Sequence, residues 1–289
     1  MTTPTEYAMR RLVRAYPLVL AAVVVGACSG TDTVIKTENI PTAGVRFINA
    51  VPDSAGAYGL DMRFVDIVES NAQFRIAFRN NPVTAGGVTA SSQTQFKNAR
   101  AGSRHFVIFL DDTLQAIAST KLKDTTVTFE AGKNYTAILW GAARAGAMKL
   151  RVFEDNPADP GANVALRVIN AGDVAIEVRQ YPQGGTAPAT ATWASVAPLA
   201  VSTFVNAAPG NIMYNVRTAG TATNLFADLL ALQGAPKAAD LEANPGTTVA
   251  GSAVTLVVFP RSTAGARTPQ TAAFMVPSGS FMWDRRPAR

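Results

Sequence analysis

The sequence predicts an all-β protein made of two tandem immunoglobulin-like antiparallel β-sandwiches, which follow a lipoprotein signal peptide. Three observations lead to this prediction: short runs of alternating polarity between turn residues, a motif that recurs about 120 residues further along the chain, and a basic and then apolar N-terminal segment that ends at a cysteine. The composition fits a folded protein, because 48% of the 289 residues are hydrophobic and only 16% are charged, whereas disordered chains show the opposite balance.

Residues 1–27 have the pattern of a secretory signal peptide. Three arginines between positions 10 and 14 precede the apolar run Leu18–Val25, and two small residues follow that run. The apolar run is too short for a membrane-spanning helix, which needs about 20 residues. We therefore expect a cleaved leader, with either Met1 or Met9 as the start of translation.

Cys28 is the only cysteine of the chain and directly follows this leader. The sequence Val25-Gly26-Ala27-Cys28 resembles the bacterial lipobox, in which the cysteine receives diacylglyceryl and acyl groups such as palmitate and becomes the new N-terminus. Two or three acyl chains anchor a protein stably, whereas a single chain binds a membrane only marginally. The alternative is an ordinary signal peptide with an incidental cysteine.

The lipobox resemblance also implies a location. Ser29, rather than an aspartate, follows the cysteine, and in enterobacterial lipoproteins this favours sorting to the outer membrane. We therefore expect a lipid-anchored protein of the bacterial cell envelope, on the periplasmic or the surface face of the outer membrane. Residues 28–43 are mostly small and polar and suit a flexible tether between the lipid and the folded body.

The basic residues argue against a nucleic-acid partner. The formal net charge is +6, but no run of five basic residues occurs, and basic and aromatic residues do not interleave as they do in nucleic-acid binders. Instead, arginines are scattered singly along the expected strands, and we interpret them as a solvated basic surface. These arginines are Arg46, Arg63, Arg75, Arg151, Arg167 and Arg179.

Short strands account for most of the chain after residue 44. Leu60–Phe64 alternates in polarity, and Phe106–Leu110 is apolar on both faces, as in a central strand. Val127 and Phe129 alternate with threonines, and Tyr135–Trp140 is expected as the return strand after a turn. In the second half, alternation predicts strands around Ile176 and Val178 and around Val254, Leu256 and Val258. Leu225–Leu230 has helical spacing, which leaves a helix or a strand plus loop open.

An internal repeat divides the chain. Val45–Ala50 reads V-R-F-I-N-A and Leu166–Ala171 reads L-R-V-I-N-A, while Tyr135–Trp140 parallels Val254–Phe259. The proline-rich segment Asn156–Gly161 has the composition of a boundary. We therefore expect one β-sandwich domain over residues 44–156 and a second over residues 162–289.

The first copy resembles a known family. The residues V-R-F-I-N-A-V-P-D at Val45–Asp53, the strand Leu60–Phe64 and A-G-K-N-Y-T-A at Ala131–Ala137 are similar to the bacterial domain of unknown function 4397 family, over about residues 44–155. In the second copy, Gly172-Asp173 replaces the Pro-Asp turn, and Ala253 is expected where the family has tyrosine. The resemblance implies secreted or surface-anchored β-sandwich modules, often in tandem, and implies neither enzyme activity nor a ligand.

The chain contains few residues of the types that form catalytic sites. His105 is the only histidine, and a Ser-His-Asp triad would need it as the base. However, His105 begins an apolar run, and the sequence contains no G-x-S-x-G turn. We expect no catalytic residue, although a carboxylate pair of the kind that hydrolyses glycosidic bonds stays open because chain spacing does not fix distance.

Metal ligands are equally sparse, and we expect no cofactor besides the lipid on Cys28. Zinc sites need several cysteines or histidines, which the chain lacks. Calcium takes carboxylate and carbonyl oxygens, so Glu154, Asp155 and Asp159 form the calcium candidate at the expected domain junction. A polar linker is the alternative interpretation.

Two aromatic residues are candidates for ligand binding. Trp193 lies in a stretch rich in threonine, alanine and proline and is expected to be exposed on a loop; with Tyr181 it could stack on a glycan. Trp140 ends a strand and is expected in the core. The leading hypothesis is a non-catalytic interaction or cell-envelope structural module held at the membrane by its lipid, with an envelope protein or glycan as partner. The alternative is a carbohydrate- or polymer-binding module that uses loop aromatics.

Overall fold

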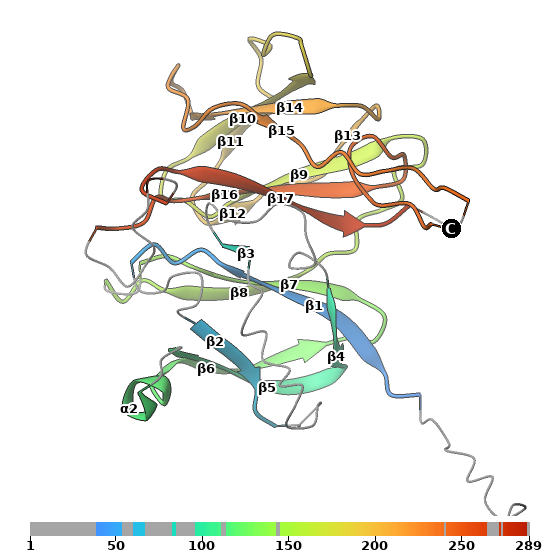
Figure 1. Ribbon diagram of the computed structural model, residues 1–289. Coiled ribbons are helices and arrows are strands. Elements are labelled where there is room, and N and C mark those ends of the chain that lie inside the picture. The colour runs from blue at the N-terminus through green and yellow to red at the C-terminus, as the bar shows by residue number, and fades with distance from the viewer. Residues whose placement is uncertain are drawn as a thin grey trace, which may run out of the picture. The chain divides into compact units, whose positions relative to one another are not determined.

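Four β-sheets make up the described part of the chain in the computed structural model (Figure 1). The structure describes residues 39–53, 60–66, 83–84, 96–110, 114–142, 145–239, 241–264, 272 and 274–287. The expected leader, Cys28 and most of the tether lie outside the described residues. In the part that is described, no helix is long and apolar enough to cross a membrane. Pro41–Arg289 forms one compact unit.

Each sheet contains strands from one half of the chain only, and we call the two groups of strands module 1 and module 2. Module 1 contains β1 (Thr42–Asn49), β2 (Leu60–Phe64), β3 (Val83–Thr84), β4 (Lys97–Arg100), β5 (Gly102–Leu110), the short helix α2 (Gln115–Ala118), β6 (Lys121–Phe129), β7 (Asn134–Trp140) and β8 (Lys149–Glu154). Module 2 contains β9 (Val164–Asn170), β10 (Ile176–Pro182), β11 (Trp193–Val196), β12 (Ala200–Val201), β13 (Val205–Ala207), β14 (Ile212–Thr218), β15 (Leu229–Leu230), β16 (Ala253–Phe259) and β17 (Ser278–Arg285). The all-β prediction is confirmed.

The first strand of each module belongs to a sheet with the same central strand pairs in both modules, although β3 is parallel to β1 whereas β12 is antiparallel to β9. In module 1, β1 pairs in parallel with β7, β7 pairs with β8, and β3 and β4 also pair with β1. In module 2, β9 pairs in parallel with β16, β16 pairs with β17, and β12 and β13 also pair with β9. The other sheets, β2-β5-β6 and β11-β10-β14-β15, are antiparallel. The parallel pairs depart from the antiparallel expectation because residue alternation does not encode strand direction.

The strand register places the repeated motifs at equivalent positions. Val45 pairs with Tyr135 in module 1, and Leu166 pairs with Val254 in module 2. The residue equivalent to the tyrosine is therefore Val254, not Ala253 as the sequence suggested.

The structure also changes one local expectation and decides between two alternatives for another stretch. β7 does not return along β6 as a hairpin, because β7 pairs with β1 and β8 while β6 pairs with β5 in the other sheet. The turn after β6 thus carries the chain between the two sheets of module 1. The stretch Leu225–Leu230 forms no helix: its last two residues are β15, and Leu225, Phe226 and Leu229 pack against the core of module 2.

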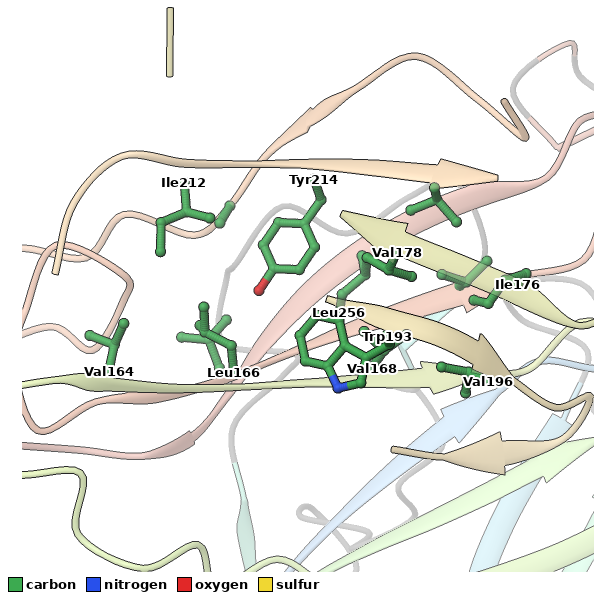
Figure 2. Packing of buried hydrophobic residues seen from close by; sticks show 14 residues of the cluster. Val164, Leu166, Val168, Ile176, Val178, Trp193, Val196, Ile212, Tyr214 and Leu256 are labelled. Atoms are coloured by element: carbon green, nitrogen blue, oxygen red, sulfur yellow. The ribbon is translucent and has the colours of Figure 1, made fainter. Parts of the chain in front are cut away.

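Three clusters of buried apolar side chains hold the described residues together. One lies between the two sheets of module 1 and another between those of module 2, where β9, β10, β11, β14 and β16 all contribute (Figure 2). The third joins the modules through β1, β7, β9, β16 and β17; its buried members are Ile48, Ala50, Ile138, Trp140, Ile169, Ala171, Val257, Phe259 and Met282. The sheets that contain β1 and β9 are thus covered on both faces.

Candidate functional site

The repeated motif places one arginine of each module between the two modules. Along β1, Val45 and Phe47 belong to the core of module 1, whereas Ile48 belongs to the cluster between the modules. Since successive residues of a strand point to opposite faces, the side chain of Arg46 lies on the inter-module face. The same alternation in β9 places Arg167 on the inter-module face of module 2.

Four charged side chains meet there and form what we call the charge cluster: Arg46, Asp155, Arg167 and Asp284. Within module 1, Arg46 Nη2 lies 3.2 Å from Asp155 Oδ2, and within module 2, Arg167 Nη2 lies 2.9 Å from Asp284 Oδ1. Between the modules, Arg46 pairs with Asp284, and Arg167 Nη2 lies 2.6 Å from Asp155 Oδ1. The four side chains are at most 5% exposed. Two positive and two negative charges therefore balance inside the protein.

A threonine in each module completes the same hydrogen-bond pattern. Arg46 Nε donates to Thr136 Oγ1 at 2.7 Å, and Thr136 donates to Asp155. In module 2, Arg167 Nε donates to Thr255 Oγ1 at 2.9 Å, and Thr255 donates to Asp284 Oδ2 at 2.5 Å. The charge cluster consequently has an approximate two-fold symmetry that relates module 1 to module 2.

Phenylalanines extend this symmetry. The guanidinium of Arg46 lies 4.3 Å from the ring centre of Phe96, and that of Arg167 lies 4.5 Å from the ring centre of Phe204. The two rings are equivalent, because Phe96 directly precedes β4 and Phe204 directly precedes β13. Such cation–π contacts are strongest where water is excluded. The symmetry is not exact, because Arg46 Nη1 also donates to the carbonyl of Trp283 at 2.6 Å.

The aspartates of the charge cluster favour the charged form of Arg167. Burial alone would lower the pKa of Arg167, but the attraction of Asp284 and Asp155 and the hydrogen bonds to them raise it above its ordinary value. Desolvating four charges is costly, and the loss of one partner leaves an uncompensated buried charge. The arrangement suits a lock between the modules, because its charged groups are engaged with one another.

The interpretation of the scattered arginines as a solvated surface is wrong for three of them. Arg46 and Arg167 lie in the charge cluster, and Arg179 is buried where its Nη1 donates to Glu177 Oε1 at 2.5 Å. Arg151 is exposed, as expected, and Arg63 is partly exposed. The recurrence of arginine at one position of both apolar motifs was the signal for a buried role. Arg75 lies outside the described residues.

The calcium candidate does not assemble. Asp155 is engaged in the charge cluster, while Glu154 Oε2 lies 2.9 Å from Lys133 Nζ and Asp159 Oδ2 lies 2.7 Å from Arg285 Nη2. Each carboxylate is thus paired with a different basic side chain. Among the described residues, no group of three or more histidine, cysteine, aspartate or glutamate side chains is arranged to hold a metal ion.

The expected exposure of Trp193 is also wrong. Trp193 begins β11 and is only 7% exposed; its ring is stacked on that of Tyr214, and its Nε1 donates to the carbonyl of Thr203 at 3.3 Å (Figure 2). The residues around Trp193 have a loop-like composition, but β11 pairs with β10, which directs the indole into the core of module 2. Trp140 is buried, as expected.

Tyr181 belongs to a polar network on the other face of β10 and β14. Its hydroxyl donates to Asp228, and this hydrogen bond, with some burial and the negative charge of Asp228, raises the pKa of Tyr181 to about 12. Asn215 Nδ2 donates to Asp228 Oδ1 at 2.7 Å and to Asn224 Oδ1 at 3.2 Å. Asn215 Oδ1 is buried and has no hydrogen-bond partner. The network therefore holds one unused acceptor, which the sequence did not indicate.

His105 is hydrogen-bonded to a carboxylate at the surface. Its Nε2 lies 2.6 Å from Asp124 Oδ1, and Lys121 Nζ lies 2.8 Å from the other oxygen of the same carboxylate. The side chains of His105 and Asp124 are 46% and 41% exposed. This arrangement is typical of a solvated polar contact between neighbouring strands.

Comparison with known proteins finds a family model that matches nearly half of the chain. Residues 43–181 match the family described as "Domain of unknown function (DUF4397)". The match begins in β1 and ends in β10, so it extends beyond residues 44–155, where the resemblance was expected. No curated protein matches the chain.

Two solved structures show only distant similarity. The Bacillus anthracis TIE protein is 12% identical over 76% of this chain, with a TM-score of 0.21, and the match spans 33% of that protein's length. A "putative cell adhesion protein" from Bacteroides fragilis is 11% identical over 85% of this chain and 98% of its own, with a TM-score of 0.18. Scores this low carry no argument about fold or function.

Proposed function

Since residues 43–181 match the DUF4397 family, we propose that the protein is a bacterial cell-envelope lipoprotein that acts as a non-catalytic interaction or structural module. In this proposal a lipid on Cys28 anchors the chain to the outer membrane, and the residues between Cys28 and β1 form a tether. The two modules then act as one rigid body that contacts an envelope protein or glycan.

The observation that carries the proposal is the pairing across the modules. Arg46 pairs with Asp284 and Arg167 pairs with Asp155, so each module supplies the counter-charges of the other. Interfaces between domains of one chain are commonly polar and permit relative motion, whereas a contact that joins buried charges to an apolar cluster resists it. A rigid two-module body suits a spacer or a docking platform. Cys28 in its lipobox-like context supports the anchor.

Mass spectrometry of the protein from the membrane fraction tests the anchor directly. We expect the N-terminal peptide to begin at Cys28 and to carry the mass of a diacylglyceryl group and an acyl chain. A Cys28→Ser strain serves as the control and should release the protein from the membrane fraction. An unmodified Cys28 in the membrane-associated protein would contradict the proposal.

Crosslinking in living cells tests the interaction role. A partner recovered with the wild-type protein and lost in the Cys28→Ser strain would support an anchored interaction module. Recovery of the lipidated chain alone would favour a glycan or polymer as partner. Turnover of a glycan that a single carboxylate substitution abolishes would instead show that the protein is a hydrolase.

A second candidate function is carbohydrate or polymer binding, and the polar network around Tyr181 favours it. Asn215 and Asp228 offer a planar amide and a carboxylate, and Asn215 Oδ1 is an acceptor without a partner. A ligand hydroxyl that reached this buried oxygen would supply the missing donor. Trp193 plays no part in this version because it is buried.

Calorimetric titration with a panel of oligosaccharides tests this alternative. If a sugar binds at the network, Asn215→Ala and Tyr181→Ala should weaken binding at least tenfold, whereas His105→Ala, in the other module, should not. No heat change with any sugar, or equal affinity in all three variants, would argue against carbohydrate binding at this place.

A further inference from the structure

The contact between the modules follows a symmetry that also permits contact between chains. We propose that the inter-module face of module 1 is self-complementary and binds the same face on a second copy of this chain. This face consists of Arg46, Thr136 and Asp155 with the apolar side chains of Ile48, Ile138 and Trp140. The proposal requires neither the lipid anchor nor a particular envelope partner.

The charged residues of module 1 can pair with those of a second module 1 face. Arg46 contacts one aspartate of its own module, Asp155, and one of the other module, Asp284. Asp284 is the equivalent of Asp155, because each directly follows the residue that pairs with Tyr135 or with Val254. In a two-fold pair of module 1 faces, Asp155 of the second copy would therefore take the place of Asp284. Every arginine would again meet two aspartates.

The apolar side chains of the two inter-module faces are also equivalent. Ile48, Ala50, Ile138 and Trp140 of module 1 occupy the register positions of Ile169, Ala171, Val257 and Phe259 of module 2. These are conservative pairs, in which an aliphatic residue matches an aliphatic one and an aromatic residue an aromatic one. A two-fold pair of module 1 faces would thus bring together the same kinds of side chain that pack between module 1 and module 2. Self-complementary faces of this kind are what isologous dimers use.

The connection between the modules explains why the contact within one chain prevails in the wild type. Only the short segment between β8 and β9 separates them, and a short linker gives the attached module an effective concentration in the millimolar range. A second copy competes with that attached module. We therefore expect the wild-type chain to be mostly monomeric in dilute solution, and pairing between copies to emerge when the contact within the chain is weakened selectively.

Reversing the charges of module 1 alone achieves this selective weakening. In the double variant Arg46→Asp and Asp155→Arg, like charges face Asp284 and Arg167 of module 2, whereas two copies of the altered face remain complementary to each other. The experiment uses the chain without residues 1–28 and measures the molar mass by light scattering after gel filtration. We expect the double variant to have twice the mass of the wild type.

The matched control reverses all four charges by adding Arg167→Asp and Asp284→Arg. This quadruple variant regains complementarity within the chain and should return to the monomer mass. A dimeric double variant with a monomeric quadruple variant supports the proposal. A monomeric or unfolded double variant alongside a folded quadruple variant overturns it, as does dimerisation of both.

A second variant decides the question if the quadruple variant does not fold. Deleting Pro157–Gly161 leaves every residue of the charge cluster in place but shortens the connection that lets the modules fold onto each other. The deletion is made together with Arg46→Asp and Asp155→Arg, so that module 1 is repelled by module 2 of either copy, and we expect twice the wild-type mass through pairing of two module 1 faces. A shortened chain that remains monomeric overturns the proposal.

Discussion

Arg46 and Asp284 lie 238 residues apart in the sequence, and their side chains form an ion pair that is almost fully buried. The arginine comes from β1 and the aspartate from β17, so the first and the last strand of the described chain are in direct contact. Arg167 and Asp155 form the equivalent contact in the opposite direction. This reciprocity explains why residues 41–289 behave as one compact unit although their sheets form two groups.

The first prediction concerns the loss of one member of the charge cluster. Asp284→Ala removes a carboxylate that both arginines contact and leaves their charge only half compensated in a buried place. Breaking a buried ion pair in this way costs about 3–5 kcal/mol of the free energy of unfolding. Urea denaturation measures the loss. Asp124→Ala, which removes an exposed ion pair, is the control, and equal effects of the two substitutions would contradict the role of the cluster.

The second prediction is that removing all four charges together does not lower the free energy of unfolding as the loss of one charge does. Replacing Arg46 and Arg167 by methionine and Asp155 and Asp284 by leucine removes all four charges together, so none remains unpaired. Buried ion networks replaced by well-packed apolar residues are often as stable as before or more stable by about 1–4 kcal/mol. Urea denaturation should therefore show a quadruple variant that is more stable than Asp284→Ala. A quadruple variant weaker than the single one would mean that the charges stabilise the protein beyond mutual compensation.

Residue alternation and the internal repeat predicted much of the fold. β2 has the expected bounds, and β5, β7, β10 and β16 lie where alternating or apolar runs indicated strands. These strands could be predicted because one face of each strand meets a sandwich core, which requires an apolar residue at every second position. The repeat predicted equivalent positions in the two modules because both copies of the motif lie in the same contact between the modules.

The errors arose where partners far apart in the sequence decide the environment. Arg46 looks like a surface arginine until β17 brings Asp284 to it, and Trp193 looks like a loop aromatic until β11 pairs with β10. The local composition around each residue does not reveal which distant strand pairs with it. The direction of β7 relative to β1 was equally hidden, since parallel and antiparallel strands show the same alternation.

The third prediction concerns the asparagine of the repeated motif. Asn170 Nδ2 lies within hydrogen-bond distance of the carbonyls of Val174, Val196 and Ala197, and its Oδ1 accepts from the backbone N–H of Gly172. Asn170→Ala leaves buried backbone groups without partners, which costs about 1–3 kcal/mol. Thermal or urea unfolding measures this loss. Asn156→Ala, at an exposed position, should leave stability nearly unchanged, and a similar loss there would contradict the explanation.

The fourth prediction distinguishes a core role from a binding role for Trp193. Truncating a buried tryptophan costs about 3–5 kcal/mol through lost burial and the cavity that remains, so Trp193→Ala should strongly lower the free energy of unfolding. Leu241→Ala, at a side chain that is 70% exposed, is the apolar surface control. If Trp193→Ala leaves stability unchanged but abolishes binding of a glycan, the core role that Figure 2 shows for the indole is contradicted.

The fifth prediction concerns alkaline pH and the hydrogen bond from Tyr181 to Asp228. The bond raises the pKa of Tyr181 from 10.0 to about 12, so between these pH values the unfolded chain loses a proton that the folded chain keeps. The stabilising contribution is therefore complete below pH 10 and declines as the pH rises toward 12. Asp228→Asn removes the negative charge and should lower the pKa of Tyr181 toward 10.0. Ultraviolet titration of the phenolate follows the change, and Tyr181→Phe identifies which transition belongs to this residue. A Tyr181 transition that Asp228→Asn does not move would show that Asp228 does not control the ionisation.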